Sequence, residues 1–204
     1  MNENEKPQTR IITPEFRVSF PAVFQPRGME GQQAKYQITM LFPSDYDLSA
    51  LKKCAVNALS IKWPDATKRP KGLRSPFQKG DEKEYDGYKG MIVVKATAIM
   101  RPKLVDADLQ PIMDEEQFYA GCYARAAIRF YAYEKSGNRG VSCSFDNVQK
   151  LRDGEKFGGG RTPEEDFGAP GAKVRKQTDR DDFPDGAVPE DQMEAPQEPD
   201  TSFP

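Results

Sequence analysis

The sequence predicts a mainly β protein with one or two helices, built around a small antiparallel barrel of five strands with long loops and a disordered acidic C-terminal tail. Several segments alternate apolar and polar residues with a period of two, which is typical of strands with one buried face. One segment carries apolar residues at helical spacing. The last 28 residues contain nine acids, one base and five prolines, so they cannot bury enough surface to offset their ordering entropy.

The first strand is predicted at residues 15–20, where apolar and polar residues alternate strictly. It opens a barrel domain at residues 13–157, and the polar residues 1–12 are expected to form a flexible N-terminus. Pro21 and Pro26 are expected to disrupt or end the strand, because proline donates no hydrogen bond to a neighbouring strand. The predicted buried face of this strand consists of Phe16, Val18 and Phe20.

The second strand is predicted at residues 34–42 and is closed by a proline. Capping oxygens at residues 44–47 precede a helix over residues 48–62, which is expected to stop near Trp63 because Pro64 follows. The apolar stripe of this helix consists of Leu48, Leu51, Ala55, Ala58 and Leu59.

The remaining barrel strands lie between long polar loops. A β-branched run predicts a central strand at residues 91–101. Segments 118–134 and 141–145 predict a hairpin joined by a loop of several residues. Loops are expected at residues 68–89 and 102–116, a glycine-rich polar linker at 158–176, and the acidic tail at 177–204.

The formal net charge of −2 is the sum of a basic body and an acidic tail. Residues 1–176 carry 29 Lys and Arg against 23 Asp and Glu, whereas the tail has a net charge of −8. A basic body indicates an anionic partner, and a flexible acidic tail can compete with that partner intramolecularly. Nucleic acid is the obvious partner.

Composition narrows the class of protein. The chain contains no histidine, so Ser-His and Cys-His nucleophile pairs and His metal ligands are excluded, and a binding protein without cofactor is favoured. Neither a membrane span nor a secretory signal is expected, which predicts a cytosolic protein. Three cysteines without a Cys-x-x-Cys spacing argue against a disulfide framework or a zinc site and are expected to be reduced and buried.

The segment 122–133 carries the most informative pattern. One face is small and apolar, as a barrel interior needs, whereas the other alternates aromatic rings with guanidinium groups. Rings stack on unstacked bases and cations neutralise the phosphates between them, so this face predicts binding of single-stranded nucleic acid. The alternative is an ordinary exposed strand, on which cross-strand pairing alone favours Tyr and Arg. The candidate residues are Tyr123, Arg125, Arg129, Tyr131 and Tyr133.

The loop at residues 68–89 has similar chemistry, so it could clamp a bound strand or simply be a solvated loop. Its candidate residues are Arg74, Phe77, Lys79, Tyr88 and Lys89. Arg17 and Lys35 are expected to share the outward face of the first sheet, and Arg101 and Lys103 lie at the end of the central strand. The glycine-rich residues 154–161 lack the ending of a P-loop, and the acids at 106–116 match no metal-binding signature.

Several blocks in order resemble a bacteriophage family of single-stranded DNA-binding proteins with an OB-fold. They include Thr13-Pro14-Glu15-Phe16-Arg17-Val18-Ser19-Phe20, Gly72-Leu73-Arg74-Ser75-Pro76-Phe77, Asp86-Gly87-Tyr88-Lys89-Gly90, Phe118-Tyr119-Ala120-Gly121-Cys122-Tyr123-Ala124-Arg125 and Asn147-Val148-Gln149-Lys150-Leu151-Arg152-Asp153-Gly154, and the resemblance covers about residues 13–167. It implies a five-stranded barrel that coats and protects single-stranded DNA in phage replication and recombination, in the cytoplasm of the infected host. The oligomeric state, monomer or dimer, stays open.

The tail is similar to those of single-strand-binding proteins whose C-terminal aromatic residue recruits replication and recombination proteins. Phe203 and the upstream Phe183 are the candidate anchors, although Pro204 follows Phe203 and departs from that pattern. Two other classes remain open: a metal-dependent nuclease or recombination enzyme acting on DNA, and a structural virion protein.

Overall fold

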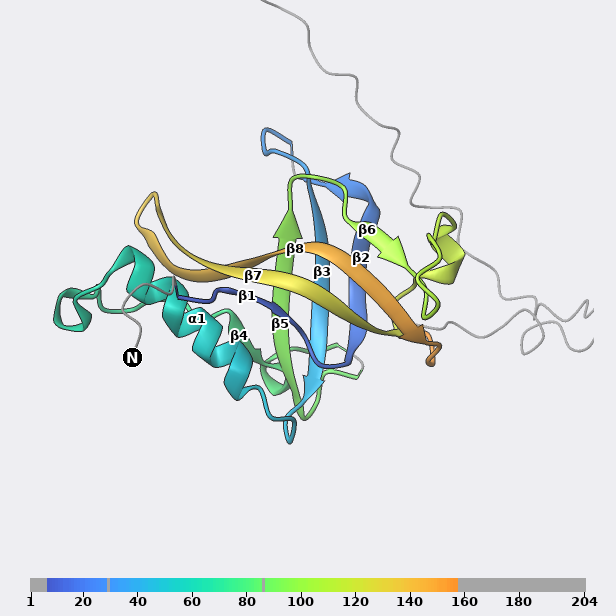
Figure 1. The fold of residues 1–204 in the computed structure, drawn as a ribbon, viewed down its shortest axis with the longest axis horizontal. Helices are drawn as coiled ribbons and strands as arrows, with labels where there is room; N and C mark the ends of the chain where they lie inside the picture. The colour runs from blue at the N-terminus through green and yellow to red at the C-terminus, as the bar shows by residue number, and fades with distance from the viewer. Residues whose placement is uncertain (1–6, 29, 86, 158–204) are drawn as a thin grey trace, which may run out of the picture. The chain divides into compact units, whose positions relative to one another are not determined.

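The computed structural model describes residues 7–28, 30–85 and 87–157, shown as a coloured ribbon in Figure 1. These residues belong to the first of two units of the chain, Met1–Gly160. The predictions for the linker and the tail, with Phe183 and Phe203, lie outside the described residues.

The described part of the chain forms strands, one α-helix and three short 3₁₀ turns. The strands are β1 (Arg10–Ile12), β2 (Phe16–Arg27), β3 (Lys35–Pro43), β4 (Phe77–Lys79), β5 (Met91–Ala98), β6 (Lys103–Val105), β7 (Tyr123–Lys135) and β8 (Asn138–Arg152). The helix is α1 (Ser49–Lys62), and the turns are Ala66–Lys68, Gly80–Glu82 and Glu115–Gln117.

Five strands form a ring in which β2 pairs with β3, β3 with β5, β5 with β8, β8 with β7 and β7 with β2. The prediction of a five-stranded barrel is confirmed, and the arrangement is that of a small, partly open barrel such as the OB-fold. One pairing, β5 with β8, is parallel rather than antiparallel and joins only Ala96 to Cys143. A ring with an odd number of strands cannot alternate in direction throughout, so at least one pair must run parallel.

Three short strands extend this ring. β1 pairs with β7, β4 with β5 and β6 with β8. The prediction of a flexible N-terminus is therefore wrong for Arg10–Ile12, which is held along β7. Likewise, β4 and β6 lie in segments that the sequence predicted as loops, because strands of three residues are too short to show a periodic pattern.

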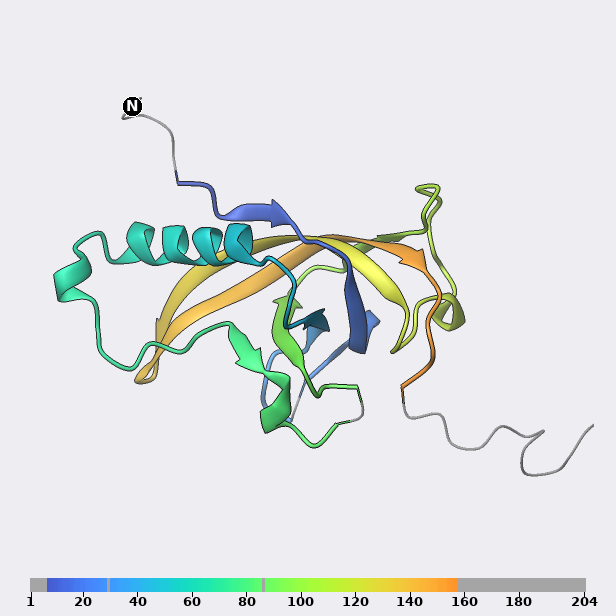
Figure 2. The same cartoon turned by 90° about the horizontal axis from the view of Figure 1, so that it is seen from below.

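The barrel interior follows the predicted alternation of β7. Cys122, Ala124, Ala126, Ile128 and Phe130 are buried, whereas their neighbours point outward. Figure 2 shows α1 lying alongside β1 and β7, and its buried residues Leu51, Cys54, Ala55 and Ala58 confirm the predicted helix. The three cysteines are buried and free, and burial raises the pKa of the Cys143 thiol to about 12.

β2 differs from its prediction. It continues through Pro21 and Pro26, although its pairing with β3 becomes irregular after Ser19, which frees the strand from the hydrogen bonds that proline cannot donate. Phe20 does not face the core, because a backbone φ of +44° turns it away from the alternation, and its side chain is 45% exposed.

The hairpin between β7 and β8 is tighter than predicted. Only Ser136 and Gly137 separate the two strands, and both have positive φ, at 49° and 78°. These angles match a type I′ turn, whose twist fits that of the flanking strands. Both strands therefore extend to the tip, and β8 begins at Asn138 rather than at Val141.

Candidate nucleic-acid interface

Three adjoining hollows run across the outer surface of the barrel. The first, of about 730 Å³, lies over the outward faces of β3 and β5. Its walls are the loop after β2 and the end of β7 beside the hairpin turn. In OB-folds the face of the second and third strands, with the loops 1–2 and 4–5, binds oligonucleotides, and β3 and β5 are the second and third strands of this ring. The lining includes Arg27, Gly28, Gln32, Lys35, Gln37, Lys95, Thr97 and Lys135.

The second hollow, of about 590 Å³, adjoins the first because Lys35 and Thr97 line both. It is formed where β5 ends and β6 begins, against the outward faces of β7 and β8. Three apolar side chains at this hollow are exposed to solvent: Ile99, Met100 and the ring of Tyr131, which is 41% exposed.

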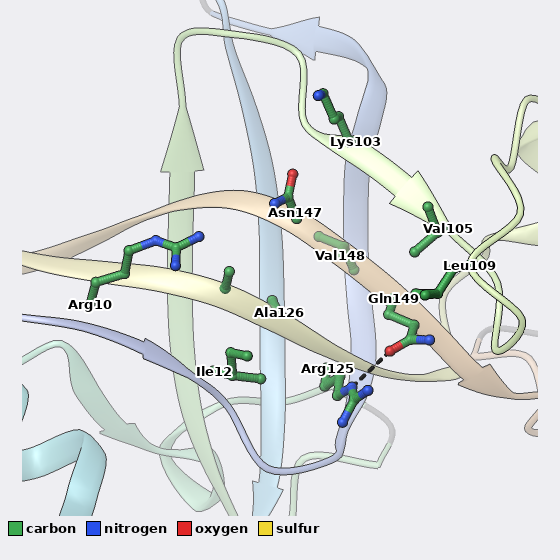
Figure 3. A pocket seen from close by; sticks show the side chains of 11 residues that line it. Arg10, Ile12, Lys103, Val105, Leu109, Arg125, Ala126, Asn147, Val148 and Gln149 are labelled. Carbon is green, nitrogen blue, oxygen red and sulfur yellow. Dashed lines mark hydrogen bonds between the residues drawn. The ribbon is translucent and has the colours of Figure 1, made fainter.

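The third hollow, of about 430 Å³, shares Lys103 and Asn147 with the second (Figure 3). The added strands β1 and β6 form its sides, and the exposed residues Ile12 and Leu109 supply apolar surface. Arg125 donates from Nε to Oε1 of Gln149 at 2.8 Å, as the dashed line in Figure 3 shows. Gln149 in turn donates to the carbonyl oxygen of Asp106 at 3.0 Å, so Arg125 is positioned through the loop after β6.

We refer to these three hollows together as the basic groove. Among the described residues that line it, eight are Lys or Arg and one is acidic, Asp146. Asp146 is paired with Arg10, with 3.4 Å between Oδ2 and Nε. A concave surface lined by one sign of charge focuses the field on an oppositely charged ligand. The basic residues are Arg10, Arg27, Lys35, Lys95, Arg101, Lys103, Arg125 and Lys135.

The predicted residues of β7 divide into two sets. Tyr131 and Arg125 line the basic groove, and Arg129 is exposed directly opposite Arg10 in the β1–β7 pairing, so both side chains share one face. Tyr123 is covered instead, because the guanidinium of Arg152 lies 3.4 Å from the centre of its ring. Tyr133 is half-buried and lines none of the three hollows.

Arg152 is held over Tyr123 by Glu15, whose Oε1 accepts from Nη2 at 2.6 Å. Donation of this hydrogen bond to Glu15 raises the pKa of the Arg152 guanidinium. This cation covers one face of the ring, so a base could stack on that face only if Arg152 moved. The role of Tyr123 in DNA binding stays a prediction.

Lys35 lines the basic groove, whereas Arg17 lines none of its three hollows. The Arg17 guanidinium lies 4.0 Å from the centre of the Phe157 ring and donates to the carbonyl oxygen of Glu155 at 2.7 Å. Arg17 therefore anchors the chain after β8. It pairs with Leu41 of β3, which lies on the same face of that strand as Lys35, so Arg17 and Lys35 share the outward face of the sheet as predicted, although only Lys35 lines the groove.

The predicted residues of the 68–89 loop do not form one surface. Tyr88 is only 2% exposed, and its hydroxyl donates to Ser19 Oγ at 3.0 Å, so its prediction as a surface residue is wrong. Burial also raises the pKa of the Tyr88 hydroxyl. Phe77 is half-buried against Phe130, with ring centres 5.8 Å apart. Arg74, Lys79 and Lys89 are exposed and line none of the three hollows.

Several groove residues were not singled out from the sequence. Lys95 had a usable signal, because a charged residue inside a buried β-branched run must point away from the core. The signal for Arg10 and Ile12 was weaker, because the run at 10–12 contains only two apolar residues after Arg10. Leu109 and Met100 had none, since apolar residues are ordinarily assigned to the core.

A partly open five-stranded barrel with a ligand-sized basic groove on its strand faces defines the class of small OB-like binding barrels. Residues 9–184 match the family described as "Enterobacter phage Enc34, ssDNA-binding protein", and the chain belongs to this family. This match confirms the resemblance predicted from the sequence.

The relatives include a phage protein and two solved structures. "Putative protein p50" of Acyrthosiphon pisum secondary endosymbiont phage 1 is 36% identical over 163 residues, covering 74% of this chain and 88% of the relative. The single-stranded DNA-binding protein from bacteriophage Enc34 in complex with ssDNA is 25% identical, with a TM-score of 0.62 over 74% of this chain and 90% of that chain. Gp2.5, a single-stranded DNA-binding protein of bacteriophage T7, is 12% identical with a TM-score of 0.52 over 73% of this chain and 94% of that chain, and it shares the fold.

Two further observations concern other classes of site. Within residues 7–28, 30–85 and 87–157, no cluster of three or more His, Cys, Asp or Glu is arranged to hold a metal ion. The helix that the structure describes is not long and apolar enough to cross a membrane.

Proposed function

We propose that this protein binds single-stranded DNA along the basic groove and so coats and protects it during phage replication and recombination. One observation carries the proposal: three hollows join into a continuous groove that combines eight cationic side chains with exposed aromatic and apolar ones. The family match and the ssDNA complex of the Enc34 relative support it.

The groove suits a flexible single strand better than a double helix. A single strand can turn its bases toward Tyr131 and the apolar side chains while its phosphates face the lysines and arginines along the groove. A duplex keeps its bases stacked inside and offers no base faces to these side chains. Stacking accepts every base, so length should matter more than base sequence.

The proposal includes no catalytic activity. The chain has no histidine, and the nuclease alternative would need a carboxylate-held metal ion. We place the protein in the cytoplasm of the infected bacterium, because its family is one of phage proteins. We further propose that the acidic tail recruits replication and recombination proteins through Phe203 or Phe183 and competes with DNA for the basic groove.

The first prediction is a salt-dependent affinity for single-stranded oligonucleotides. The logarithm of the binding constant should fall linearly with the logarithm of salt concentration, by about 0.7 per phosphate contacted. Lys95→Glu should weaken binding and flatten this slope, because Lys95 lies on the groove face of β5. Fluorescence titration at several salt concentrations measures both quantities.

Lys52→Glu is the matched control, since Lys52 is exposed on α1 and lines none of the hollows of the groove. A salt-independent affinity, or equal losses in the two variants, would rule out the basic groove as the DNA site.

A second experiment adds magnesium to the protein and labelled single strands. The strands should show a shifted gel band and stay uncut, whereas fragments would favour a nuclease. No binding at all would favour a structural virion protein.

A further inference from the structure

A fourth hollow adjoins the basic groove on the side of β2. It has a volume of about 440 Å³ and is lined by aromatic rings from three separate segments of the chain. Phe20 comes from β2, Tyr85 and Tyr88 come from the loop before β5, and Phe157 follows β8. Arg27 lines both this hollow and the first hollow of the groove, so the two surfaces are continuous. We refer to it as the aromatic hollow.

Phe20 is exposed here at a conformational cost. Its φ of +44° lies in the left-handed region, which side chains other than Gly, Asn and Asp rarely occupy. A strained residue of this kind often belongs to a functional site, where the strain positions a side chain. The strained backbone at Phe20 places its ring partly in solvent, where the residue is 45% exposed. Burial of the ring would be more favourable, so hydrophobic packing does not explain this conformation.

The other rings form a firm wall around Phe20. Tyr85 is 55% exposed and meets Phe20 edge to face, with ring centres 5.2 Å apart. Tyr88 lies behind Tyr85 at 5.2 Å and is fixed by its hydrogen bond to Ser19. Two exposed rings are thus supported by a buried ring, so they can accept a flat ligand without a rearrangement of the wall.

We propose that the aromatic hollow holds a nucleobase of a single strand whose backbone continues from the basic groove past Arg27. This inference rests on the proposed function and extends the DNA path beyond the basic groove. A base stacks on an exposed aromatic ring, and Arg27 lies where a phosphate must pass from one hollow to the other. The continuity through Arg27 favours a nucleic acid over a protein ligand at this site.

The test compares Phe20→Gly with the parent protein on oligothymidylates of graded length, from about 4 to 16 nucleotides, the range of single OB-fold sites. Glycine adopts positive φ without strain, so this variant removes the ring and keeps the backbone. Tyr85→Ala removes the second exposed ring. Tyr46→Ala is the control, because Tyr46 is an exposed aromatic residue that lines neither the groove nor the aromatic hollow.

Both hollow variants should lose affinity by about 5- to 150-fold for strands long enough to reach the hollow, and should match the parent on shorter ones. The control should match the parent at every length. An oligonucleotide with a terminal 5-iododeoxyuridine should cross-link to Phe20 or Tyr85 on irradiation.

Equal affinities of the hollow variants and the parent at every length, with no cross-link, would overturn the inference while leaving the proposed function intact. A loss that is independent of length would also overturn it, because the effect would then act through the groove. Loss of a protein partner with unchanged DNA affinity would assign the hollow to a protein ligand instead. Failure of the parent protein to bind any strand would count against the proposed function itself.

Discussion

The outward side chains of β7 differ in how freely they can contact a ligand. Tyr131 has an exposed ring at the second hollow, whereas the ring of Tyr123 is covered by Arg152. Two tyrosines on the same face of one strand therefore have different roles. The neighbour that covers Tyr123 comes from β8, 29 residues further along the chain, so strand alternation could not reveal it.

This difference gives a prediction for single substitutions. Tyr131→Ala should weaken binding of single-stranded DNA by about 1 to 3 kcal/mol, the usual cost of losing one stacked base. Tyr123→Ala should leave DNA affinity almost unchanged, because its ring already stacks on a cation. Arg125→Ala should mainly flatten the salt slope, since it removes a charge at the third hollow.

Oligonucleotide titrations with each variant measure these effects, and thermal melts confirm that each variant folds. If Tyr123→Ala weakened binding more than Tyr131→Ala did, the DNA would pass the start of β7 near Arg152, and the assignment of the basic groove as the DNA site would be wrong.

At the scale of elements, the short strands added to the barrel ring shape the site. β1 and β6 form the sides of the third hollow, and β4 covers part of the edge of β5. The segment before β4 is attached to the hairpin through a single bridge between Arg74 and Gly140. In this bridge Arg74 accepts from Val141 at 3.0 Å and donates to Arg139 at 2.9 Å through its backbone.

Gly140 is required for this attachment, because a Cβ at this position would collide with the backbone of Arg74. Gly140→Ala should therefore push the segment before β4 away from the hairpin and destabilise the protein by about 1 to 3 kcal/mol, as overpacking does. Urea unfolding measures the loss, and faster hydrogen exchange at the amides of Arg74 and Val141 would locate it.

Arg74→Ala is the control for that experiment. It keeps the backbone bridge and removes only an exposed side chain, so its free energy of unfolding should stay within about 0.5 kcal/mol of the parent. Equal stability of Gly140→Ala and the parent would mean that the hairpin tip can shift freely and that the bridge does not hold the segment.

At the scale of the whole molecule, the opposed charges of body and tail suggest regulation of the groove. Eight basic residues of the body line the groove, while the tail carries a net charge of −8. A flexible tether can hold such a tail near the groove at an effective concentration in the millimolar range. DNA would then have to displace it.

Deletion of residues 177–204 should therefore strengthen binding to single-stranded DNA at low salt and reduce the salt dependence there. The same deletion should abolish capture of replication proteins, because Phe183 and Phe203 are lost with it. The comparison is between the full chain and a version ending at Lys176, in a DNA titration and a pull-down from infected cells. Unchanged results in both assays would leave the tail with a solubilising role.

The sequence by itself determined the barrel class, the helix and the inner face of β7. These features depend on patterns within single segments: apolar residues at a period of two over 122–130 and a stripe of three and four over 48–62. The charge split between body and tail also needs no structure, because charge is a property of composition.

Only the tertiary structure decided which outward residues share a surface. Tyr88 and Arg17 look available in the sequence, but contacts with Ser19 and Phe157 occupy them. Arg10, Lys95 and Lys103 come from three separate strands, and only the pairing of those strands brings them onto one groove. The physical reason is that a period within a strand fixes which way a side chain points, whereas its neighbours depend on pairings between residues far apart in the chain.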